Sequence, residues 1–498
     1  MIELEHISYW YPRRKEAALR DVSLRIDNGE AVCVMGRNGS GKSTLVKLIA
    51  GLIKPERGAV TVGGRSGENS TDGGVAILFQ NPDNQMVATV VEKEIAFALE
   101  NRAMIQSDME TVIDRTAAQF GIEHLRRRLT SELSGGEKQR VALASVMVQE
   151  PSVLLLDEPD SFLDQTGRRI LAEELGGLHE RDRGLIEIRI TQSADVARHY
   201  ARLIVLDDGA VVADGLPGNV LADGSLCART GLVVPDTATF QVTVPARLSR
   251  PAVEEQRLRQ VSVERVDFAW PLSSPVLRDM SVSLAGGETL GLVGPTGAGK
   301  SSLALLIAGL VNPSQGQVMY LNGHGGVLTA AGVRGQVSLV LQQPERQFFL
   351  ESCAQEIEFG PKNLGRTLAS AEINGFFDMV GLNPVRYRDR DPFTLSAGEK
   401  RRLAFAAVLA MTPSIIVFDE PTAGLDGEGV GRFIALSRAL KSLGTGQMII
   451  SHDGDVIRQL TDRVLYLSRP GETLSLSPSE LFDNQRYAGV VTRPSRLL

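Results

Sequence analysis

The feature that most constrains this chain is an internal duplication. A glycine-rich stretch, GRNGSGKST at residues 36–44, returns as GPTGAGKSS at residues 294–302. Two later blocks repeat as well: LSGGEKQR (133–140) returns as LSAGEKRR (395–402), and VLLLDEP (153–159) returns as IIVFDEP (415–421). The offset between the copies is nearly constant, which indicates one domain duplicated in tandem. Each copy is too large to be a solenoid repeat, so the sequence predicts two similar domains.

The length and composition fit this organisation. A chain of 498 residues exceeds the size at which one hydrophobic core stops growing, and its 43% hydrophobic residues can fill two cores. We expect domains at residues 1–222 and 261–498. Residues 223–260 contain Pro235, Pro245 and Pro251 and no sustained strand or helix pattern, so we predict a linker there. The polar stretch after Ser468 is expected to form a tail.

The order of the patterns predicts the fold class. Strand-like segments precede each glycine-rich stretch, and an apolar pattern with helical spacing follows it (STLVKLIAGL and SSLALLIAGL). Each copy later contains an apolar run that ends in Asp-Glu, which is typical of a buried strand in a parallel sheet. This order is that of an α/β fold of the P-loop type, present twice.

Charge and cysteine content exclude several classes of protein. The net charge of −7 and the pI of about 5.6 disfavour a nucleic-acid-binding role. Cys33, Cys227 and Cys353 are too few and too scattered for a disulfide framework or a cysteine-based metal site, which fits a reducing compartment. The first residues show no secretion signal, and no apolar run of 18 residues occurs. Any membrane role is therefore expected to be peripheral, at the cytoplasmic face, through protein partners.

The glycine-rich stretches predict two nucleotide sites. Glycines let backbone N–H groups approach phosphates at a helix N-terminus, while Lys42 and Lys300 are expected to reach the β- and γ-phosphates. Ser43 and Ser301 are expected to hold the Mg²⁺ of bound ATP. The residues predicted to contact nucleotide here are Gly36, Asn38, Gly39, Gly41, Lys42, Ser43 and Thr44, and Gly294, Thr296, Gly297, Gly299, Lys300, Ser301 and Ser302.

The Asp-Glu pairs predict the catalytic centre. Asp157 and Asp419 end apolar runs, so each carboxylate is expected at the carboxyl edge of a buried strand, where α/β proteins place ligands, in contact with Mg²⁺. Glu158 and Glu420 follow immediately and are expected to polarise the attacking water. An acidic helix cap is the alternative interpretation of each pair.

The blocks LSGGEKQR and LSAGEKRR resemble the signature sequence of ATP-binding-cassette (ABC) ATPases, and the resemblance covers nearly the whole chain apart from the linker and tail. It implies a parallel-sheet core, an antiparallel β subdomain and a helical subdomain in each domain, and two ATP molecules sandwiched between the domains. The signature residues expected to contact ATP are Ser134, Gly135 and Gly136, and Ser396, Ala397 and Gly398. From the residues alone, each serine with a glutamate three positions later also predicts a helix N-cap.

Other blocks match the same family residue by residue. Gln80 and Gln342 resemble the glutamine that joins the Mg²⁺ site to the surface that contacts the membrane subunits. Tyr11 and Trp270 resemble the aromatic residue that stacks on adenine, although aromatic residues are also common in ordinary strands. His452 resembles the histidine that contacts the γ-phosphate.

The two predicted sites are unequal. Gln192 stands where the second copy has His452, and glutamine donates a hydrogen bond but carries no charge. The family resemblance implies that the Lys42 site is closed by the second signature, in which Ala397 replaces a glycine. The loop EPDSFLD after the first apolar run also departs from EPTAGLD in the second copy. We therefore expect the Lys300 site, with Glu420 and His452, to hydrolyse most of the ATP; the alternative is that both sites turn over.

The segments after Gln80 and Gln342 indicate which class of ABC ATPase the chain resembles. NPDNQMVATVVEKEIAFALEN and QPERQFFLESCAQEIEFGPKN resemble the coupling region of energy-coupling-factor (ECF) ATPases, which power importers of vitamins and transition-metal ions. The resemblance implies a transmembrane coupling subunit and a substrate-binding membrane subunit as partners. The groove for the coupling subunit is expected at Asp83, Gln85, Glu94, Glu345, Gln347 and Glu356, with acidic side chains facing a basic partner. A solvated acidic helix face is the simpler alternative.

Three other classes were considered for a double cassette. ATPases of sugar importers have a similar length but lack the paired Asn-Pro-x-x-Gln and Gln-Pro-x-x-Gln segments. ABC translation factors are disfavoured by the acidic net charge and by the lack of a long basic arm between the domains. DNA-repair ABC proteins would need cysteine clusters or long coiled coils, which this sequence does not contain.

Overall fold

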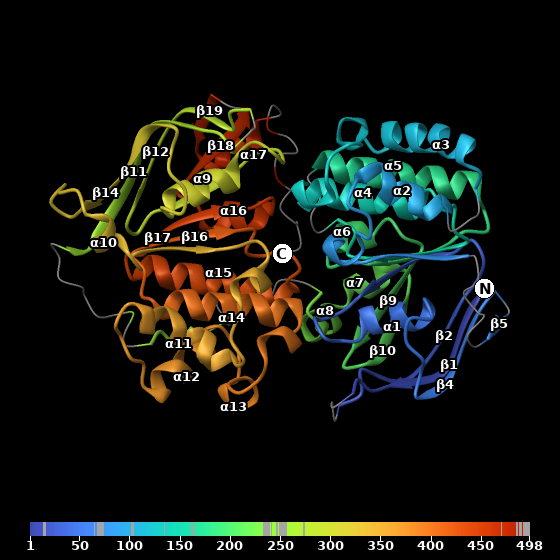
Figure 1. Cartoon of the computed structure of the whole chain (residues 1–498). Coiled ribbons are helices and arrows are strands. Elements are labelled where there is room, and N and C mark those ends of the chain that lie inside the picture. The colour runs from blue at the N-terminus through green and yellow to red at the C-terminus, as the bar shows by residue number, and fades with distance from the viewer. Residues whose placement is uncertain are drawn as a thin grey trace. The chain divides into compact units, whose positions relative to one another are not determined.

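In the computed structural model the chain divides into two compact units, Met1–Val233 and Val234–Leu498 (Figure 1). The structure describes the whole chain except residues 13–15, 64, 67–73, 101–103, 134, 161–162, 164, 233–239, 241, 246–247, 249–255, 272–273, 470, 485–486, 488–490 and 492–498. The side chains of residues 65, 66, 165, 166, 181, 330 and 469 are also outside the description.

The first unit contains two sheets. An antiparallel sheet of order β2-β1-β4-β5 consists of β1 (Ile2–Tyr9), β2 (Leu19–Ile26), β4 (Arg57–Val62) and β5 (Arg65–Ser66). The second sheet, of order β10-β9-β3-β8-β7-β6, consists of β3 (Ala31–Met35), β6 (Val75–Leu78), β7 (Val153–Asp157), β8 (Ile186–Ile190), β9 (Arg202–Asp207) and β10 (Ala210–Gly215). All neighbouring pairs in it are parallel except the β9–β10 pair.

The second unit repeats this arrangement. Its antiparallel sheet, of order β12-β11-β14, consists of β11 (Leu258–Phe268), β12 (Leu277–Ala285) and β14 (Gln315–Asn322). Its larger sheet, of order β15-β16-β17-β13-β18-β19, consists of β13 (Thr289–Val293), β15 (Val337–Val340), β16 (Ile415–Asp419), β17 (Gly446–Ile450), β18 (Arg463–Arg469) and β19 (Glu472–Leu476). Strands β7 and β16 are buried along their whole length, as expected for central strands covered on both faces.

Helices surround each larger sheet and form a separate helical layer in each unit. The first unit has α1 (Lys42–Ile49), α2 (Val91–Glu100), α3 (Gln106–Gln119), α4 (Gly135–Met147), α5 (Gln165–Arg181), α6 (Ala194–Ala197), α7 (Pro217–Ala222) and α8 (Gly224–Thr230). The second has α9 (Lys300–Ile307), α10 (Ala330–Val333), α11 (Cys353–Asn363), α12 (Ser370–Met379), α13 (Pro384–Tyr387), α14 (Ala397–Ala410), α15 (Gly427–Ser442), α16 (Gly454–Leu460) and α17 (Pro478–Asp483). The predicted α/β class with a parallel core, a β subdomain and a helical subdomain is confirmed.

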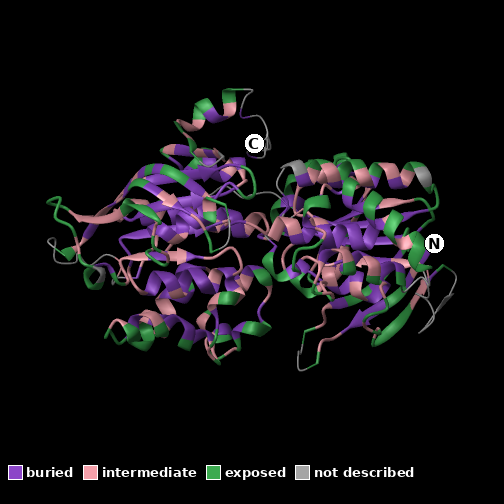
Figure 2. Ribbon diagram, turned by 45° about the horizontal axis from the view of Figure 1, so that its top comes forward, coloured by how far each residue is buried: buried purple, intermediate pink, exposed green. Residues whose placement is uncertain are grey.

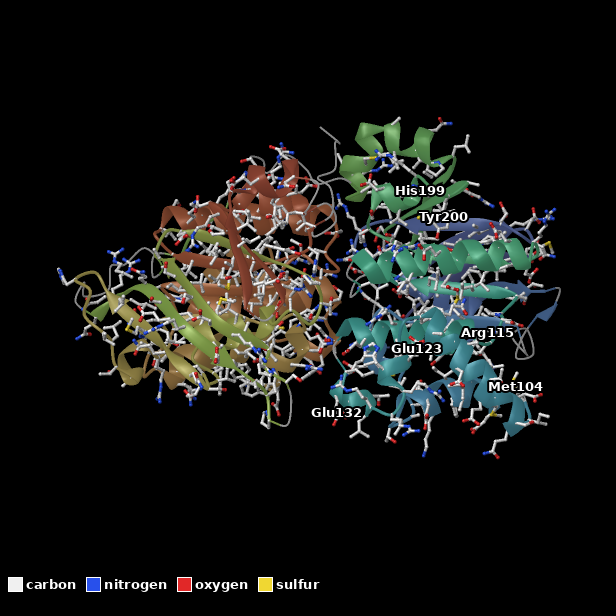
Figure 3. All side chains as sticks on the ribbon, turned by 90° about the horizontal axis from the view of Figure 1, so that it is seen from above. Met104, Arg115, Glu123, Glu132, His199 and Tyr200 are labelled. Carbon is white, nitrogen blue, oxygen red and sulfur yellow. The ribbon has the colours of Figure 1, made fainter. Side chains whose placement is uncertain are left out.

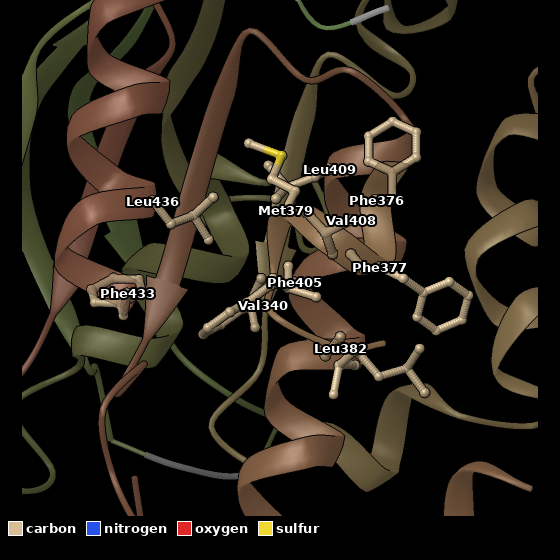
Figure 4. Close-up of a cluster of buried hydrophobic side chains, with 14 of the residues drawn as sticks. Val340, Phe376, Phe377, Met379, Leu382, Phe405, Val408, Leu409, Phe433 and Leu436 are labelled. Atoms are coloured by element: carbon tan, nitrogen blue, oxygen red, sulfur yellow. The ribbon is translucent and has the colours of Figure 1, made fainter. Parts of the chain in front are cut away.

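The helical layers pack on the larger sheets through apolar clusters. Figure 2 colours the ribbon of these layers by burial. In the second unit, α12 contributes Phe376 and Phe377, and α14 contributes Phe405, to one buried cluster (Figure 4) that also includes Phe418 of β16. The rings of Phe405 and Phe418 meet edge to face, with centroids 5.7 Å apart. The equivalent cluster of the first unit is built largely from leucine, isoleucine and valine.

The regions predicted as linker and tail contain regular structure. Helix α8 lies within residues 223–260, and β11 begins at Leu258. The predicted linker residues Val242, Val244 and Leu248 pack against the apolar core of the second unit, whereas Pro235 and Pro251 lie outside the described residues. The predicted tail adds β19, which pairs antiparallel with β18. Strand β19 is an edge strand with several exposed residues, so its sequence has the polar composition of a tail.

Within the described parts of the chain, no helix combines the length and the apolar character that a membrane span requires.

Candidate nucleotide-binding and hydrolysis sites

The two glycine-rich loops have backbone conformations that require glycine. Gly36 and Gly41, between β3 and α1, have φ values of 145° and 103°. A Cβ on Gly36 would lie 2.0 Å from the Leu206 carbonyl oxygen, and one on Gly41 would lie 2.5 Å from the Ala18 carbonyl oxygen. Gly294 repeats this geometry, with φ 151° and a hypothetical Cβ 2.0 Å from the Leu467 carbonyl oxygen. Each loop is thus a closely packed backbone turn that leads into a helix N-terminus.

The predicted lysines fold back across these loops. Lys42 Nζ donates to the carbonyl oxygens of Gly36 and Arg37, both at 2.8 Å. Lys300 Nζ donates to the carbonyl oxygens of Gly294 at 2.7 Å and Pro295 at 2.8 Å. Both units therefore place an ammonium group inside the loop, beside the N-terminus of the following helix. This arrangement suits a polyphosphate, because lysine and helix N-terminus both attract anions.

A serine and an aspartate meet beside each loop. Ser301 Oγ donates to Asp419 Oδ2 at 2.9 Å, and Ser43 forms a hydrogen bond with Asp157. Burial raises the pKa of Asp419 to about 6, with the neighbouring Glu420 charge as the second cause and the Ser301 hydrogen bond opposing both. Burial also raises the pKa of Asp157. A hydroxyl and a buried carboxylate are oxygen ligands of the kind that Mg²⁺ uses together with nucleotide phosphates, so these residues fit that ion.

In the first unit two predicted residues, Gln80 and Gln192, meet the carboxylate of Glu158, and Asn38 lies beside Gln192. Glu158 follows β7 with φ 48°, and its N–H donates to the Ile190 carbonyl oxygen at 3.1 Å. Gln80 Nε2 donates to Glu158 Oε2 at 2.8 Å, and Gln192 Nε2 lies 3.3 Å from Glu158 Oε1. Gln192 Nε2 also lies 3.4 Å from Asn38 Oδ1. Both oxygens of Glu158 thus accept from neutral amides.

The second unit surrounds its glutamate differently. Glu420 has φ 50°, and its N–H donates to the Ile450 carbonyl oxygen at 2.9 Å. His452 Nε2 lies 3.6 Å from Glu420 Oε1, and the His452 N–H donates to Oε2 at 3.4 Å. Glu420 Oε1 is buried and forms no hydrogen bond with the described residues. The left-handed backbone at both glutamates is uncommon outside glycine and is often found at functional sites.

The predicted adenine-stacking residues lie beside the loops. The Tyr11 hydroxyl is 3.2 Å from Thr44 Oγ1, and Trp270 Nε1 donates to Ser302 Oγ at 3.2 Å. Each aromatic ring contacts a second ring edge to face, Tyr9 in the first unit and Phe268 in the second. In each unit the aromatic side chain therefore forms a hydrogen bond with the hydroxyl of the residue two positions after the lysine, Thr44 or Ser302.

The other predicted contacts are only partly described. Ser396 caps α14 in a capping box with Glu399, in which the Glu399 N–H donates to Ser396 Oγ at 3.4 Å and the Ser396 N–H donates to Glu399 Oε2 at 2.8 Å. The N-cap interpretation of Ser396 is therefore confirmed. Ser134 lies outside the described residues. The remaining signature and loop positions lie at helix starts or in the loops: Gly135 and Gly136 in α4, Ala397 and Gly398 in α14, and Gly39, Gly297, Gly299 and the exposed Thr296 in the loops.

Comparison with known proteins identifies the family. The family model described as "ABC transporter" matches residues 19–161 and again residues 277–423. The chain belongs to the ABC transporter family. It is a tandem ABC ATPase, and ATP binding and hydrolysis are the activities of its two cassettes.

Several relatives extend over both cassettes. An ABC transporter ATP-binding protein of Bifidobacterium longum is 31% identical over 93% of this chain, which spans 64% of that protein. YkoD of Bacillus subtilis, whose name assigns it to HMP/thiamine import, is 30% identical over 97% of this chain and 93% of its own length. Among solved structures, the archaeal ribosome recycling factor aABCE1 aligns with 95% of this chain and 90% of its own, at a TM-score of 0.62 and 21% identity. That last likeness shows the shared fold.

The expected coupling groove is wrong at Glu94 and Glu356. Both side chains are buried, and each accepts two backbone N–H groups from the preceding loop. Glu94 Oε2 accepts from Val87 at 2.9 Å and Ala88 at 2.6 Å, and Glu356 Oε1 accepts from Phe349 at 2.6 Å and Leu350 at 2.7 Å. These carboxylates fix a loop; they do not face a partner. The sequence did not reveal this, because an acidic residue in the first turn of a helix is usually solvated.

The other groove residues are divided between structural and exposed roles. Gln85 Oε1 accepts from the Phe79 N–H at 3.2 Å, and Gln347 Nε2 donates to the Leu339 carbonyl oxygen at 3.1 Å. Asp83 forms an ion pair with Lys138 of α4. Glu345 is half-buried. Several apolar side chains also reach the surface here: Val87, Phe97, Phe349 and Phe359 are 69%, 42%, 58% and 38% exposed.

Two arginines near the glutamates were missed by the sequence analysis. In the first unit Arg189, on β8, forms an ion pair with Asp160 at 3.4 Å. In the second unit Arg401, on α14, donates to the carbonyl oxygens of Glu420 and Gln342. A signal for each was present, because Arg189 and Glu187 are charged residues between the isoleucines of the buried strand β8, and Arg401 replaces the Gln139 of the first copy.

Proposed function

We propose that this chain is the ATP-hydrolysing subunit of an ECF-type importer of a vitamin or transition-metal ion. In this proposal the cassettes bind the coupling subunit at the cytoplasmic face of the membrane, and the substrate-binding subunit selects the cargo. The observation that carries the proposal is the coupling segment, which has the same construction in both cassettes. The B. subtilis relative named for HMP/thiamine import supports a vitamin-type cargo.

The coupling segments combine a fixed loop with exposed apolar side chains. In each cassette a buried glutamate, Glu94 or Glu356, accepts two N–H groups of the loop and so fixes its shape. In the second cassette the rings of Phe349 and Phe359 meet edge to face, 4.5 Å apart, at the surface. Exposed aromatic pairs on a rigid surface are typical of protein interfaces. We therefore propose that a helix of the coupling subunit binds here through apolar side chains, with Glu345 and Asp83 at the edge.

For hydrolysis, we propose that Glu420 orients the attacking water in the more active site. Water attacks the γ-phosphorus, the bond to the β,γ-bridging oxygen breaks, and ADP and phosphate result. Ser301 and Asp419 would hold the Mg²⁺ of the nucleotide, and that ion would supply charge neutralisation at the phosphate oxygens. The buried Glu420 Oε1 is an acceptor without a hydrogen-bond donor among the described residues, which suits a carboxylate that receives a water proton. His452 and Lys300 supply positive charge or hydrogen bonds to the γ-phosphate.

The slower site is proposed around Lys42, Glu158 and Gln192. There, both oxygens of Glu158 already accept from the amides of Gln80 and Gln192. An attacking water at Glu158 would have to share the carboxylate with these two amide donors, so the water is held less well there. We propose that this site binds ATP and turns over slowly.

Co-purification tests the membrane role. The tagged chain is recovered from detergent-solubilised membranes of its own source, and the co-purifying proteins are identified by mass spectrometry. The proposal predicts one transmembrane scaffold and a small hydrophobic binding subunit. Recovery of a sugar permease with a soluble binding protein, or of ribosomes, would contradict it.

Surface variants test the proposed docking residues. Phe349→Asp places a charge in the apolar pair and is expected to abolish recovery of the scaffold. Leu310→Asp is the matched control, because Leu310 is 63% exposed and follows α9. Equal loss of the scaffold in both variants would refute the proposed surface.

A further inference from the structure

Arg401 connects three functional segments of the second cassette. It is the fifth residue of α14, the helix that follows the signature serine, and it is only 7% exposed. Its Nη1 donates to the carbonyl oxygen of Glu420, and its Nη2 donates to the carbonyl oxygen of Gln342 at 2.8 Å. One buried guanidinium group therefore links the signature helix, the segment after β15 and the loop that carries the glutamate.

This link depends on the shape of the arginine side chain. A guanidinium group has several N–H donors in a rigid plane and can contact two carbonyl oxygens at once. A buried charge is costly unless it is paired, and two carbonyl acceptors supply hydrogen bonds to it here. Displacing either segment would break one of these bonds in a buried environment, where the loss is large. The two segments should therefore move together.

The first cassette uses a different residue at this position. Gln139 is completely buried, and its Nε2 donates to the Pro159 carbonyl oxygen at 2.9 Å. Its Oε1 has no hydrogen-bond donor among the described residues. The glutamine carries no charge and holds the loop one residue further along, at the proline that follows Glu158.

The loop of the first cassette is instead held from the sheet. Arg189 of β8 pairs with Asp160, and its Nη1 lies 3.5 Å from the hydroxyl of Tyr200 (labelled in Figure 3). In the second cassette the residues at these positions are Thr422 and Ile449, so the arginine–aspartate pair is missing, and Thr422 Oγ1 instead donates to Asp453 Oδ2 at 3.4 Å. Arg189 of β8 pairs with Leu156 of β7, and Ile449 of β17 pairs with Phe418 of β16, so Arg189 and Ile449 occupy equivalent positions in the two sheets. The two glutamate loops are thus anchored by arginines that come from different elements.

We infer that Arg401 is a positioning residue that couples the Gln342 segment to Glu420. A shift of the Gln342 segment, which leads directly into the proposed docking surface, would be transmitted to the Glu420 backbone through the two hydrogen bonds of one side chain. The first cassette, with Gln139, lacks this charged double contact, so its glutamate loop responds less to the same shift. The inference rests on the proposed role of Glu420 in hydrolysis.

Arg401→Gln in the full-length chain tests the inference, because it installs the residue of the first cassette. Steady-state ATPase activity is measured in a Glu158→Gln background, so that turnover reports on the second site. We expect kcat to fall about tenfold while KM for ATP changes less than twofold, because Arg401 donates to the backbone carbonyl oxygens of Gln342 and Glu420 and so acts on their positions. Arg401→Lys, which keeps the charge but has one nitrogen, is expected to recover part of the loss.

Arg402→Gln is the matched control. Arg402 is the next residue of α14 and also donates to a backbone carbonyl oxygen, that of Gly381, at 3.1 Å. Its substitution removes the same side chain from the same helix but leaves the Glu420 loop untouched. We expect kcat and KM of this variant to stay within twofold of the parent. A similar loss of kcat in both variants would overturn the inference, since it would show a general effect of α14.

Hydrogen exchange distinguishes coupling from loss of stability. In Arg401→Gln, peptides covering residues 341–347 and 420–425 should exchange faster together, while the β13 and β18 peptides should not change. Unchanged exchange in either segment would overturn the inference. This readout needs no turnover, so it remains decisive if Glu420→Gln proves active and the proposed role of Glu420 fails.

Discussion

The two glutamates of this chain occupy the same backbone position but have different neighbours. Glu158 and Glu420 each follow a buried strand with a left-handed φ, and each donates its N–H to the strand alongside. Glu158 accepts from two glutamine amides, whereas Glu420 lies beside an imidazole and has a buried oxygen without a hydrogen bond to the described residues. A duplicated fold therefore preserves the geometry of the backbone while side chains set the chemistry of each copy.

The largest expected effect is the removal of the glutamate in the second cassette. Glu420→Gln should lower the steady-state rate of ATP hydrolysis by about 100-fold or more, a typical loss for a general base. Glu158→Gln should lower it less than twofold. Phosphate release by the two purified variants provides the measurement. Equal losses in the two variants would show that both cassettes contribute equally to ATP hydrolysis.

The Arg189–Asp160 ion pair of the first cassette should have the next largest effect, on stability. Arg189→Met leaves the half-buried Asp160 without its cation, which is expected to cost about 1.5 to 3 kcal/mol of unfolding free energy. The double variant Arg189→Ile with Asp160→Thr, which copies Ile449 and Thr422, should recover most of this loss because no charge remains unpaired. Urea unfolding of the three proteins checks the prediction. A double variant as unstable as the single one would show that the pair is not the cause.

Exchanging the residues near the γ-phosphate should have a moderate effect. His452→Gln installs the residue of the slower site and is expected to reduce turnover about tenfold, because a neutral amide replaces the imidazole. Gln192→His should raise the activity of a Glu420→Gln background, by a smaller factor. The prediction fails if His452→Gln leaves the rate of phosphate release unchanged.

The smallest expected effect is a pH dependence confined to the first cassette. The hydrogen bond that His179 Nε2 donates to Glu187 Oε2, at 2.8 Å, raises the pKa of His179 against the opposing effect of burial, and the charges of Glu187 and Asp182 add to the increase. The folded state therefore holds the His179 proton more tightly than the unfolded state. The resulting stabilisation is complete below pH 6.5 and is lost as the pH rises through the higher pKa of the folded state. Thermal unfolding at pH 6 and pH 8 should show a smaller loss of stability in His179→Gln than in the parent, because only the buried aspartates such as Asp419 then still titrate in this range.

Local motifs predicted the positions of the nucleotide loops well. The glycines, Lys42 and Lys300 follow one another closely in the chain, so their spacing alone specifies a strand, a turn and a helix. Gln80, Asn38, Glu158 and Gln192 come from distant segments, and the family resemblance indicated that they meet. Their hydrogen-bond partners were not predictable, because these depend on side-chain directions at the sheet edge.

Burial of charged residues was the main limit of the sequence analysis. Glu94 and Glu356 were expected at a surface, but their carboxylates turn inward to the N–H groups of a preceding loop. Arg189 and Arg401 likewise pair with groups that are remote in sequence, Asp160 and the carbonyl oxygens of Gln342 and Glu420. A charge in the sequence is usually solvated, so only tertiary packing shows which ones are not.

A single-turnover experiment shows whether the two cassettes hydrolyse ATP at unequal rates. The full-length chain is mixed with a small excess of radiolabelled ATP over its two sites, and phosphate formation is followed by rapid quenching. Unequal cassettes should give a fast phase with an amplitude of one phosphate per chain, followed by a much slower phase. A single fast phase of two phosphates per chain would contradict unequal rates.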